Sequence, residues 1–129
     1  MTLTYTNSEQ LFIGIDGGGS KCKAVIYAGN KILGEGLSGR ANPLHGIQQT
    51  FTSMTQAVQL AAVNAELPTE ALSQTIAGVG LAGVNLNKLK QQVEAWQHPF
   101  AQMFVTTDLH TACIGAHQGG DGAVIITGT

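Results

Sequence analysis

The sequence has little charge and no long apolar run, and each shortage removes a class of function. Six Lys and Arg residues against eight Asp and Glu residues give a net charge of -2 without a basic cluster, so the chain lacks the positive surface that binds nucleic-acid phosphates. The longest uncharged run of apolar residues and glycine, 76–84, has nine residues, whereas crossing a bilayer takes about 20. Residues 1–10 lack the cationic start and apolar core of a signal peptide. We therefore expect a cytoplasmic protein that binds neither nucleic acid nor membrane.

Cysteine and histidine are also scarce, which argues against a disulfide framework or a metal centre. Cys22 and Cys113 have no CxxC spacing, and we expect both to be buried, reduced thiols. Of the four histidines, His110 and His117 would share a helix face, but two ligands without a third make a poor zinc site. The 129 residues suffice for one domain with a real core.

Glycine, by contrast, is abundant, and three of the 17 glycines stand together in the segment 11–27, LFIGIDGGGSKCKAVIY. Apolar runs at 11–15 and 24–27 predict two strands joined by a short turn. The glycines at 17–19 have no Cβ and can adopt backbone angles closed to other residues, so an anion could approach their N–H groups. Asp-Gly and Gly-Gly are also common hairpin pairs. The loop alone therefore fits a plain turn and a phosphate site equally well.

Two residues beside these glycines strengthen the phosphate interpretation. Asp16 stands at the end of the first strand, where a carboxylate could hold a hydrated Mg²⁺, and Lys21 adds positive charge. The loop is not a P-loop, because Ser20 precedes Lys21 and reverses the required Gly-Lys-Ser/Thr order. A dinucleotide loop should open a helix, whereas this one leads into a β-rich segment.

The rest of the chain alternates between helical and extended patterns. Their order is β-β-β-α-β-α-β-α, followed by one more strand, which predicts an α/β fold with a mixed five-stranded sheet and helices on both faces. The first strand should lie beside the parallel fourth and fifth strands, so Asp16 and Asp108, 92 positions apart, should reach the same edge. After 11–27 we expect strands at 31–37, 75–81, 103–107 and 122–127, and helices at 46–65, 86–96 and 109–117, with a short helical turn from Thr69.

Two features in the second half of the chain have competing interpretations. Gly78, Gly80 and Gly83 spell G-x-G-x-x-G between a strand and a helix, which would suit a dinucleotide-binding oxidoreductase. Close packing of the strand against helices explains the same glycines more simply. Asp108 could be the N-cap of the helix at 109–117, a general base, or both at once.

Four motifs together resemble the N-terminal lobe of the BadF/BadG/BcrA/BcrD ATPase family, and within it the N-acetylglucosamine and glucosamine kinases. The motifs are IDGGGSK, LSGRANPL, TTD before a helix, and the terminal GAVIITGT. The resemblance covers residues 11–129 and implies the ribonuclease H-like, actin-like ATPase lobe of the actin/hexokinase/Hsp70 superfamily. It divides the chain into a tail at 1–10, the lobe at 11–119, and at 120–129 the first strand of a second lobe.

On the ATP side, the resemblance implies binding of ATP and Mg²⁺ at two loops. Asp16 would hold the Mg²⁺ through water, and the glycine loop would wrap the terminal phosphates. A second phosphate loop would begin at the end of the chain. The residues in contact with ATP would be Gly17, Gly18, Gly19, Ser20, Lys21, Thr127, Gly128 and Thr129.

On the sugar side, the resemblance implies an amino sugar whose 6-hydroxyl attacks the γ-phosphate of ATP. Asn42 would hydrogen-bond the sugar hydroxyls, and Asp108 would bind the 6-hydroxyl and take its proton as general base. A protein catalyses phosphoryl transfer mainly by positioning the substrates and stabilising charge, and these implied residues could do both. The motifs leave the choice between glucosamine, N-acetylglucosamine and another hexose open.

The sequence stops inside the second phosphate loop, whereas a second lobe follows in the family. We therefore expect residues 1–129 alone to be inactive and the complete kinase to form a homodimer. An isolated 122–127 strand would be an exposed edge that favours self-association. Two alternatives stay open: an ATPase activator of a 2-hydroxyacyl-CoA dehydratase, which would need an iron–sulfur cluster, and a non-catalytic sugar-sensing module.

Overall fold

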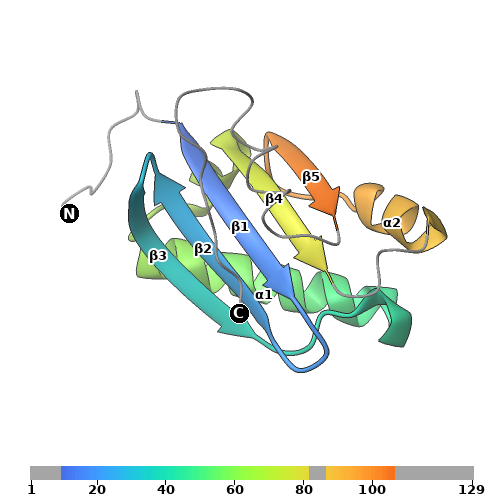
Figure 1. Ribbon diagram of the computed structural model, residues 1–129. Helices are drawn as coiled ribbons and strands as arrows, with labels where there is room; N and C mark the ends of the chain where they lie inside the picture. Colours follow the sequence, from blue (N-terminus) through green and yellow to red (C-terminus); the bar gives the residue numbers. More distant parts are fainter. Residues whose placement is uncertain (1–9, 82–86, 107–129) are drawn as a thin grey trace.

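The computed structural model describes residues 10–81 and 87–106, which form one mixed sheet with helices packed against it (Figure 1). The sheet has five strands in the order β3-β2-β1-β4-β5. β1 pairs antiparallel with β2 and parallel with β4, and β4 pairs parallel with β5. The expected α/β class and the position of the first strand are therefore confirmed. The strands are β1 (Leu11–Gly17), β2 (Cys22–Ala28), β3 (Lys31–Ser38), β4 (Thr75–Leu81) and β5 (Gln102–Thr106).

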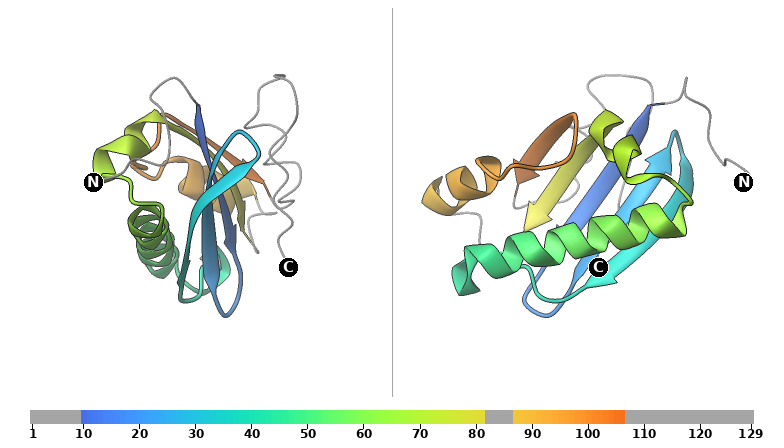
Figure 2. Two further views of the ribbon diagram at one scale, coloured as in Figure 1. Left: turned by 90° about the vertical axis from the view of Figure 1, so that its left-hand side faces the viewer. Right: turned by 180° about the vertical axis from the view of Figure 1, so that it is seen from behind.

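The principal helix, α1, lies across one face of the sheet (Figure 2). Its apolar residues recur every three or four positions, which buries one stripe against the strands. Among the described residues, no helix has the length and apolar character needed to cross a membrane. The helices are η1 (Pro43–His45), α1 (Ile47–Asn64), η2 (Thr69–Gln74) and α2 (Asn87–Glu94), where η marks a 3₁₀-helix.

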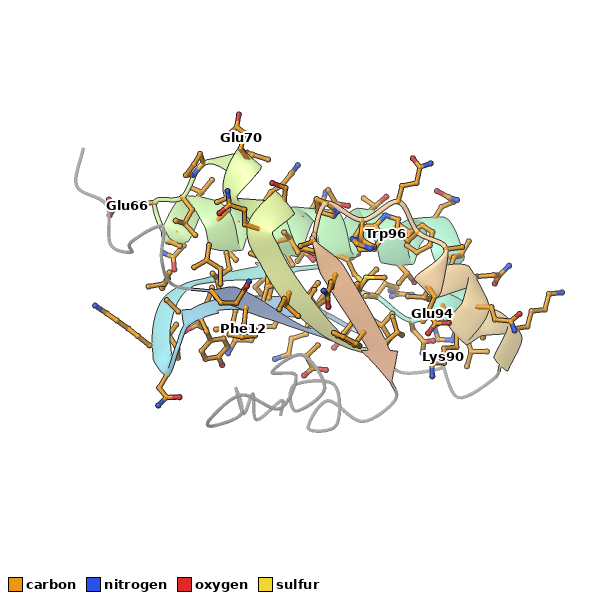
Figure 3. All side chains as sticks on the ribbon, turned by 90° about the horizontal axis from the view of Figure 1, so that it is seen from above. Phe12, Glu66, Glu70, Lys90, Glu94 and Trp96 are labelled. Carbon is orange, nitrogen blue, oxygen red and sulfur yellow. The ribbon has the colours of Figure 1, made fainter. Side chains whose placement is uncertain are left out.

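The shorter helix, α2, ends at Glu94 rather than at the expected residue 96. The N–H of Trp96 donates to the carbonyl of Val93 at 3.1 Å, only three residues back, so the last turn tightens. The Trp96 ring then stacks on Phe51 of α1, with 5.4 Å between ring centroids and 8° between planes. In Figure 3, Trp96 lies against α1. The helix expected at 109–117 and the strand expected at 122–127 lie outside the described residues.

Successive residues of β1 face opposite sides of the sheet. Leu11, Ile13 and Ile15 belong to the large core under α1, whereas Phe12 packs with Val25 and Tyr27 on the opposite face (Figure 3). Asp16 is four residues after Phe12 in the same strand, so it lies on the same face of the sheet, away from α1. The alternation thus places a carboxylate at the end of β1 without burying it in the α1 core.

Two glycines of β3 allow α1 to pack directly on the backbone of that strand. A Cβ at Gly36 would overlap the carbonyl of Ala57 and come within 2.6 Å of the Ala61 nitrogen. A Cβ at Gly34 would come within 2.6 Å of the Ala61 carbonyl oxygen and 2.5 Å of the Ala65 nitrogen. Because glycine has no Cβ, the helix and strand can approach this closely.

Candidate active site

The loop that contains glycines 17–19 is the turn of a β-hairpin, as the sequence predicted. β1 and β2 stay paired up to Gly17 and Cys22. The N–H of Gly18 then donates to the carbonyl of Lys21 at 2.9 Å and closes the turn. Because this bond occupies the Gly18 N–H, the free donors of the turn are the N–H groups of residues 19–21, which bond to no other described residue. An anion would therefore be held by the second half of the loop.

The three glycines have different structural roles. Gly17 is buried, and a Cβ there would overlap the side chain of Leu81 and lie 2.8 Å from the Ala41 Cβ. A Cβ at Gly18 would meet only the Lys21 carbonyl oxygen at 3.9 Å, and one at Gly19 would meet nothing within 4 Å. Gly17 is therefore required by packing, whereas Gly18 and Gly19 leave space at the tip of the hairpin.

Glycines 17–19 have the freedom to adopt left-handed backbone angles, but the hairpin does not use it. Among the described glycines, positive φ occurs at Gly29 and Gly46 and not at 17–19. The four-residue loop turns without the left-handed conformation that tighter hairpins demand. What the glycines provide is the absence of a side chain.

Asp16 is half-buried at the end of β1, beside Lys23 on one neighbouring strand and Gly80 on the other. The Nζ of Lys23 pairs instead with Glu35, at 3.2 Å from its Oε1. Within 10–81 and 87–106, no cationic side chain forms an ion pair with the Asp16 carboxylate, and no three His, Cys, Asp or Glu residues cluster at metal-binding distances. A single carboxylate fits Mg²⁺ that is held mostly by water and phosphate oxygens.

The LSGRANPL loop runs directly beside the hairpin. The N–H of Ala41 donates to the carbonyl of Gly18 at 2.9 Å. The next residue, Asn42, caps η1, because its Oδ1 accepts from the N–H of Leu44 at 3.0 Å. The Asn42 Nδ2 group has no partner in the part of the chain that the structure describes, so it can donate to a ligand.

Asp108, Thr127, Gly128 and Thr129 lie outside the described residues. The strand register nevertheless fixes where the chain leaves β5. Asp16 is level with Gly80, and Gly80 is level with Thr106. Two strand spacings separate Asp16 from Thr106, roughly 10 Å. Thr106, the last described residue of β5, therefore lies at the same edge of the sheet as Asp16, where ligands of such sheets bind.

The dinucleotide interpretation does not fit β4. Gly78 and Gly80 lie inside the strand, paired with Gly14 and Asp16 of β1. A dinucleotide fingerprint needs its first glycines in the turn after the strand, where the pyrophosphate meets the helix N-terminus. These glycines instead form part of the sheet.

Cys22 is buried at the base of the hairpin, as expected for a reduced thiol. Burial raises the pKa of the Cys22 thiol from 9.0 to about 12, and the negative charge of Asp16 adds to this, while a hydrogen bond with Ser38 opposes it. The thiol is therefore protonated at neutral pH and is not a nucleophile.

We expect Cys22 to resist thiol reagents for as long as the chain is folded. In a Cys113→Ala background, labelling by a disulfide reagent at neutral pH should be roughly a hundredfold or more slower in buffer than in urea. Rapid labelling of the folded chain would contradict the buried position.

The same pKa shift predicts a pH effect on stability. Because the folded state keeps a proton that the unfolded chain loses above pH 9.0, the free energy of unfolding should fall as the pH rises from 9 towards 12. Urea unfolding curves below and above pH 9 should show this loss, and Cys22→Ala should lessen it. An unchanged pH dependence in Cys22→Ala would argue against the shift.

The fold is that of the actin-like ATPases and ROK kinases. A ROK hexokinase from Thermus thermophilus superposes with a TM-score of 0.54 at 18% sequence identity, over 85% of this chain and 38% of that chain. A protein from Chromobacterium violaceum, provisionally assigned as an N-acetylglucosamine kinase, superposes with a TM-score of 0.71 at 28% identity, over 88% of this chain and 40% of that chain.

Residues 13–129 match the BadF/BadG/BcrA/BcrD ATPase family, and the chain belongs to this family. It is 37% identical over 125 residues to the glucosamine kinase GspK of Vibrio cholerae. That alignment covers 92% of this chain and 40% of the relative, so the chain spans well under half the length of the kinase that it matches.

Proposed function

We propose that the chain is the N-terminal lobe of an ATP-dependent amino-sugar kinase, which transfers the γ-phosphate of ATP to the sugar 6-hydroxyl. The observation that carries the proposal is the open tip of the β1–β2 hairpin beside a carboxylate that has no cationic partner among the described residues. The similarity to the Vibrio cholerae glucosamine kinase supports phosphorylation of an amino sugar.

On the ATP side, the N–H groups of residues 19–21 would hold the terminal phosphates, and Lys21, which is exposed, would add charge. Asp16 would orient Mg²⁺ through water, and Mg²⁺ would neutralise charge on the transferred phosphoryl group. Thr127, Gly128 and Thr129 would begin the second phosphate loop. These residues together would enclose the phosphates from two sides.

On the sugar side, Asp108 would accept the proton of the 6-hydroxyl as that oxygen attacks the γ-phosphorus. Asn42 would donate from Nδ2 to a sugar hydroxyl while its Oδ1 caps η1. The proton acceptor and the sugar-binding loop would then lie next to the phosphates, and such positioning is most of what phosphoryl transfer requires.

Because the chain spans 40% of its Vibrio cholerae relative, we further propose that activity needs a second lobe and that residues 1–129 alone are inactive. The complete kinase would be a cytoplasmic homodimer, and residues 1–129 alone would associate through 122–127. These statements concern the whole protein and follow from the family resemblance.

A substrate panel tests the proposal. The protein, at the length at which its source organism makes it, should release ADP in the presence of glucosamine or N-acetylglucosamine, and kcat/KM should identify the preferred sugar. Residues 1–129 alone should release none. Absence of sugar-dependent ADP release from the natural-length protein would contradict the proposal, and turnover by 1–129 would contradict the need for a second lobe.

Asn42→Asp separates the two roles of Asn42. The aspartate keeps an oxygen that can accept from the Leu44 N–H, so thermal stability should stay near that of the wild type, but it removes the Nδ2 donor. The sugar KM should therefore rise roughly tenfold. Asn42→Ala is the comparison, and should also lose about 1 kcal/mol of stability with its cap. An unchanged sugar KM in Asn42→Asp would remove Asn42 from the sugar site.

A further inference from the structure

A backbone hydrogen bond joins the β1–β2 hairpin, which would bind ATP, to the LSGRANPL loop, which would bind the sugar. The N–H of Ala41 donates to the Gly18 carbonyl at 2.9 Å, across 23 positions of sequence. Ala41 has no exposed surface. Since the Asn42 backbone follows directly, any shift of the hairpin base reaches the proposed sugar-binding side chain through one residue.

At Gly17 the hairpin packs closely against the LSGRANPL loop. Of the three atoms nearest to a Cβ at Gly17, one belongs to the Leu81 side chain and two belong to Ala41, its Cβ at 2.8 Å and its carbonyl oxygen at 2.9 Å. Real Cβ atoms essentially never approach other atoms this closely. The Leu81 side chain could rotate away, but the Ala41 backbone could yield only if the loop moved.

The loop has little freedom to absorb such a movement before it reaches Asn42. At its start, the Ser38 hydroxyl donates to the Ser53 carbonyl of α1. At its end, the loop continues directly into η1, which the Asn42 side chain caps. Ala41 immediately precedes Asn42 in this short segment, so a displacement of Ala41 changes the position of Asn42.

We propose that Gly17 is a positioning residue for the amino sugar: it acts through Ala41 to set where Asn42 stands relative to the phosphate hairpin. The inference rests on the proposed kinase function and adds a sugar-positioning role to a residue of the ATP-side loop. If Gly17 affected only the binding of the ATP phosphates, its replacement would raise the KM for ATP and leave the sugar KM unchanged. The two possibilities thus differ in which substrate is affected.

The test is Gly17→Ala in the natural-length protein. The sugar KM should rise about 10- to 100-fold, with kcat and the KM for ATP changed much less, because ground-state and transition-state contacts to the sugar are lost equally. Gly39→Ala is the matched control in the same loop, since its Cβ would make only an ordinary contact of 3.8 Å with the Ser53 hydroxyl. A rise confined to the KM for ATP would overturn the inference.

A second variant keeps the test informative if Gly17→Ala does not fold. Gly17→Ala combined with Leu81→Ala removes the side-chain overlap but keeps the contacts with Ala41. Relative to Leu81→Ala alone, which loses a buried side chain, the added Gly17→Ala should cost less stability than it does in the wild type. The double variant should retain the raised sugar KM. Recovery of a normal sugar KM would show that Leu81, not the loop, carried the effect, and would overturn the inference.

Amide hydrogen exchange of the 129-residue chain tests the link independently of activity. The Ala41 amide should be protected in the wild type and in Gly39→Ala, and should lose protection in Gly17→Ala. Unchanged protection in Gly17→Ala would contradict the link. A wild-type protein without sugar turnover would instead contradict the proposed function, so the two failures are distinguishable.

Discussion

Asp108→Asn is expected to lower kcat for phosphorylation of the amino sugar by about 10²–10⁴-fold, while the KM values for ATP and sugar change little. Asparagine has nearly the shape of aspartate but cannot accept the proton that, in the proposed reaction, the 6-hydroxyl loses as it attacks the γ-phosphorus. The effect should therefore appear in the chemical step. Steady-state kinetics of the natural-length protein, with both substrates varied, measures it.

The control for Asp108→Asn is Glu94→Gln, which removes one carboxylate from an exposed position of α2. It should leave kcat unchanged, so that any loss in Asp108→Asn cannot be attributed to net charge. Near-normal turnover by Asp108→Asn would show that another group takes the proton.

Gly36→Ala is expected to have the largest effect on stability, a loss of about 3 kcal/mol or more. The added Cβ would overlap the Ala57 carbonyl and come within 2.6 Å of the Ala61 nitrogen. Both are backbone atoms of α1, so no rotamer change relieves the overlap, and the helix must move away from β3. Urea or thermal unfolding of the 129-residue chain measures the loss.

Gly19→Ala is the control, because its Cβ would meet no atom within 4 Å. Its free energy of unfolding should stay within about 0.5 kcal/mol of the wild type. Equal stability of Gly36→Ala and Gly19→Ala would contradict the close packing of α1 on β3.

Local sequence patterns predicted most of the sheet and the principal helix. Burial leaves a local pattern in the sequence: apolar runs in β1, β2 and β4, and apolar residues every three to four positions in α1. Such patterns can be recognised from neighbouring residues alone. The order of these elements then fixed the parallel pairing of β1 with β4. The end of α2 was less predictable, because it depends on Trp96 stacking on Phe51 of another helix.

The site was predicted only in part, because its geometry depends on contacts between distant segments. Asp16 and the hairpin were identified from local sequence. The cap formed by Asn42 also had a local signal, since Asn before Pro favours turn initiation. No sequence signal indicated the contact of Gly17 with Leu81 and Ala41, because it joins residues of three different segments. For the same reason, the sequence did not indicate that Gly17 is required by packing rather than by the phosphate loop.

The most direct test of the kinase proposal is to identify the product by ³¹P NMR after the natural-length protein is incubated with ATP, Mg²⁺ and glucosamine or N-acetylglucosamine. The predicted result is ADP together with a phosphomonoester whose phosphorus couples to the two protons on sugar carbon 6. ADP with inorganic phosphate and no sugar phosphate would contradict the proposal and would favour an ATPase that does not phosphorylate sugars.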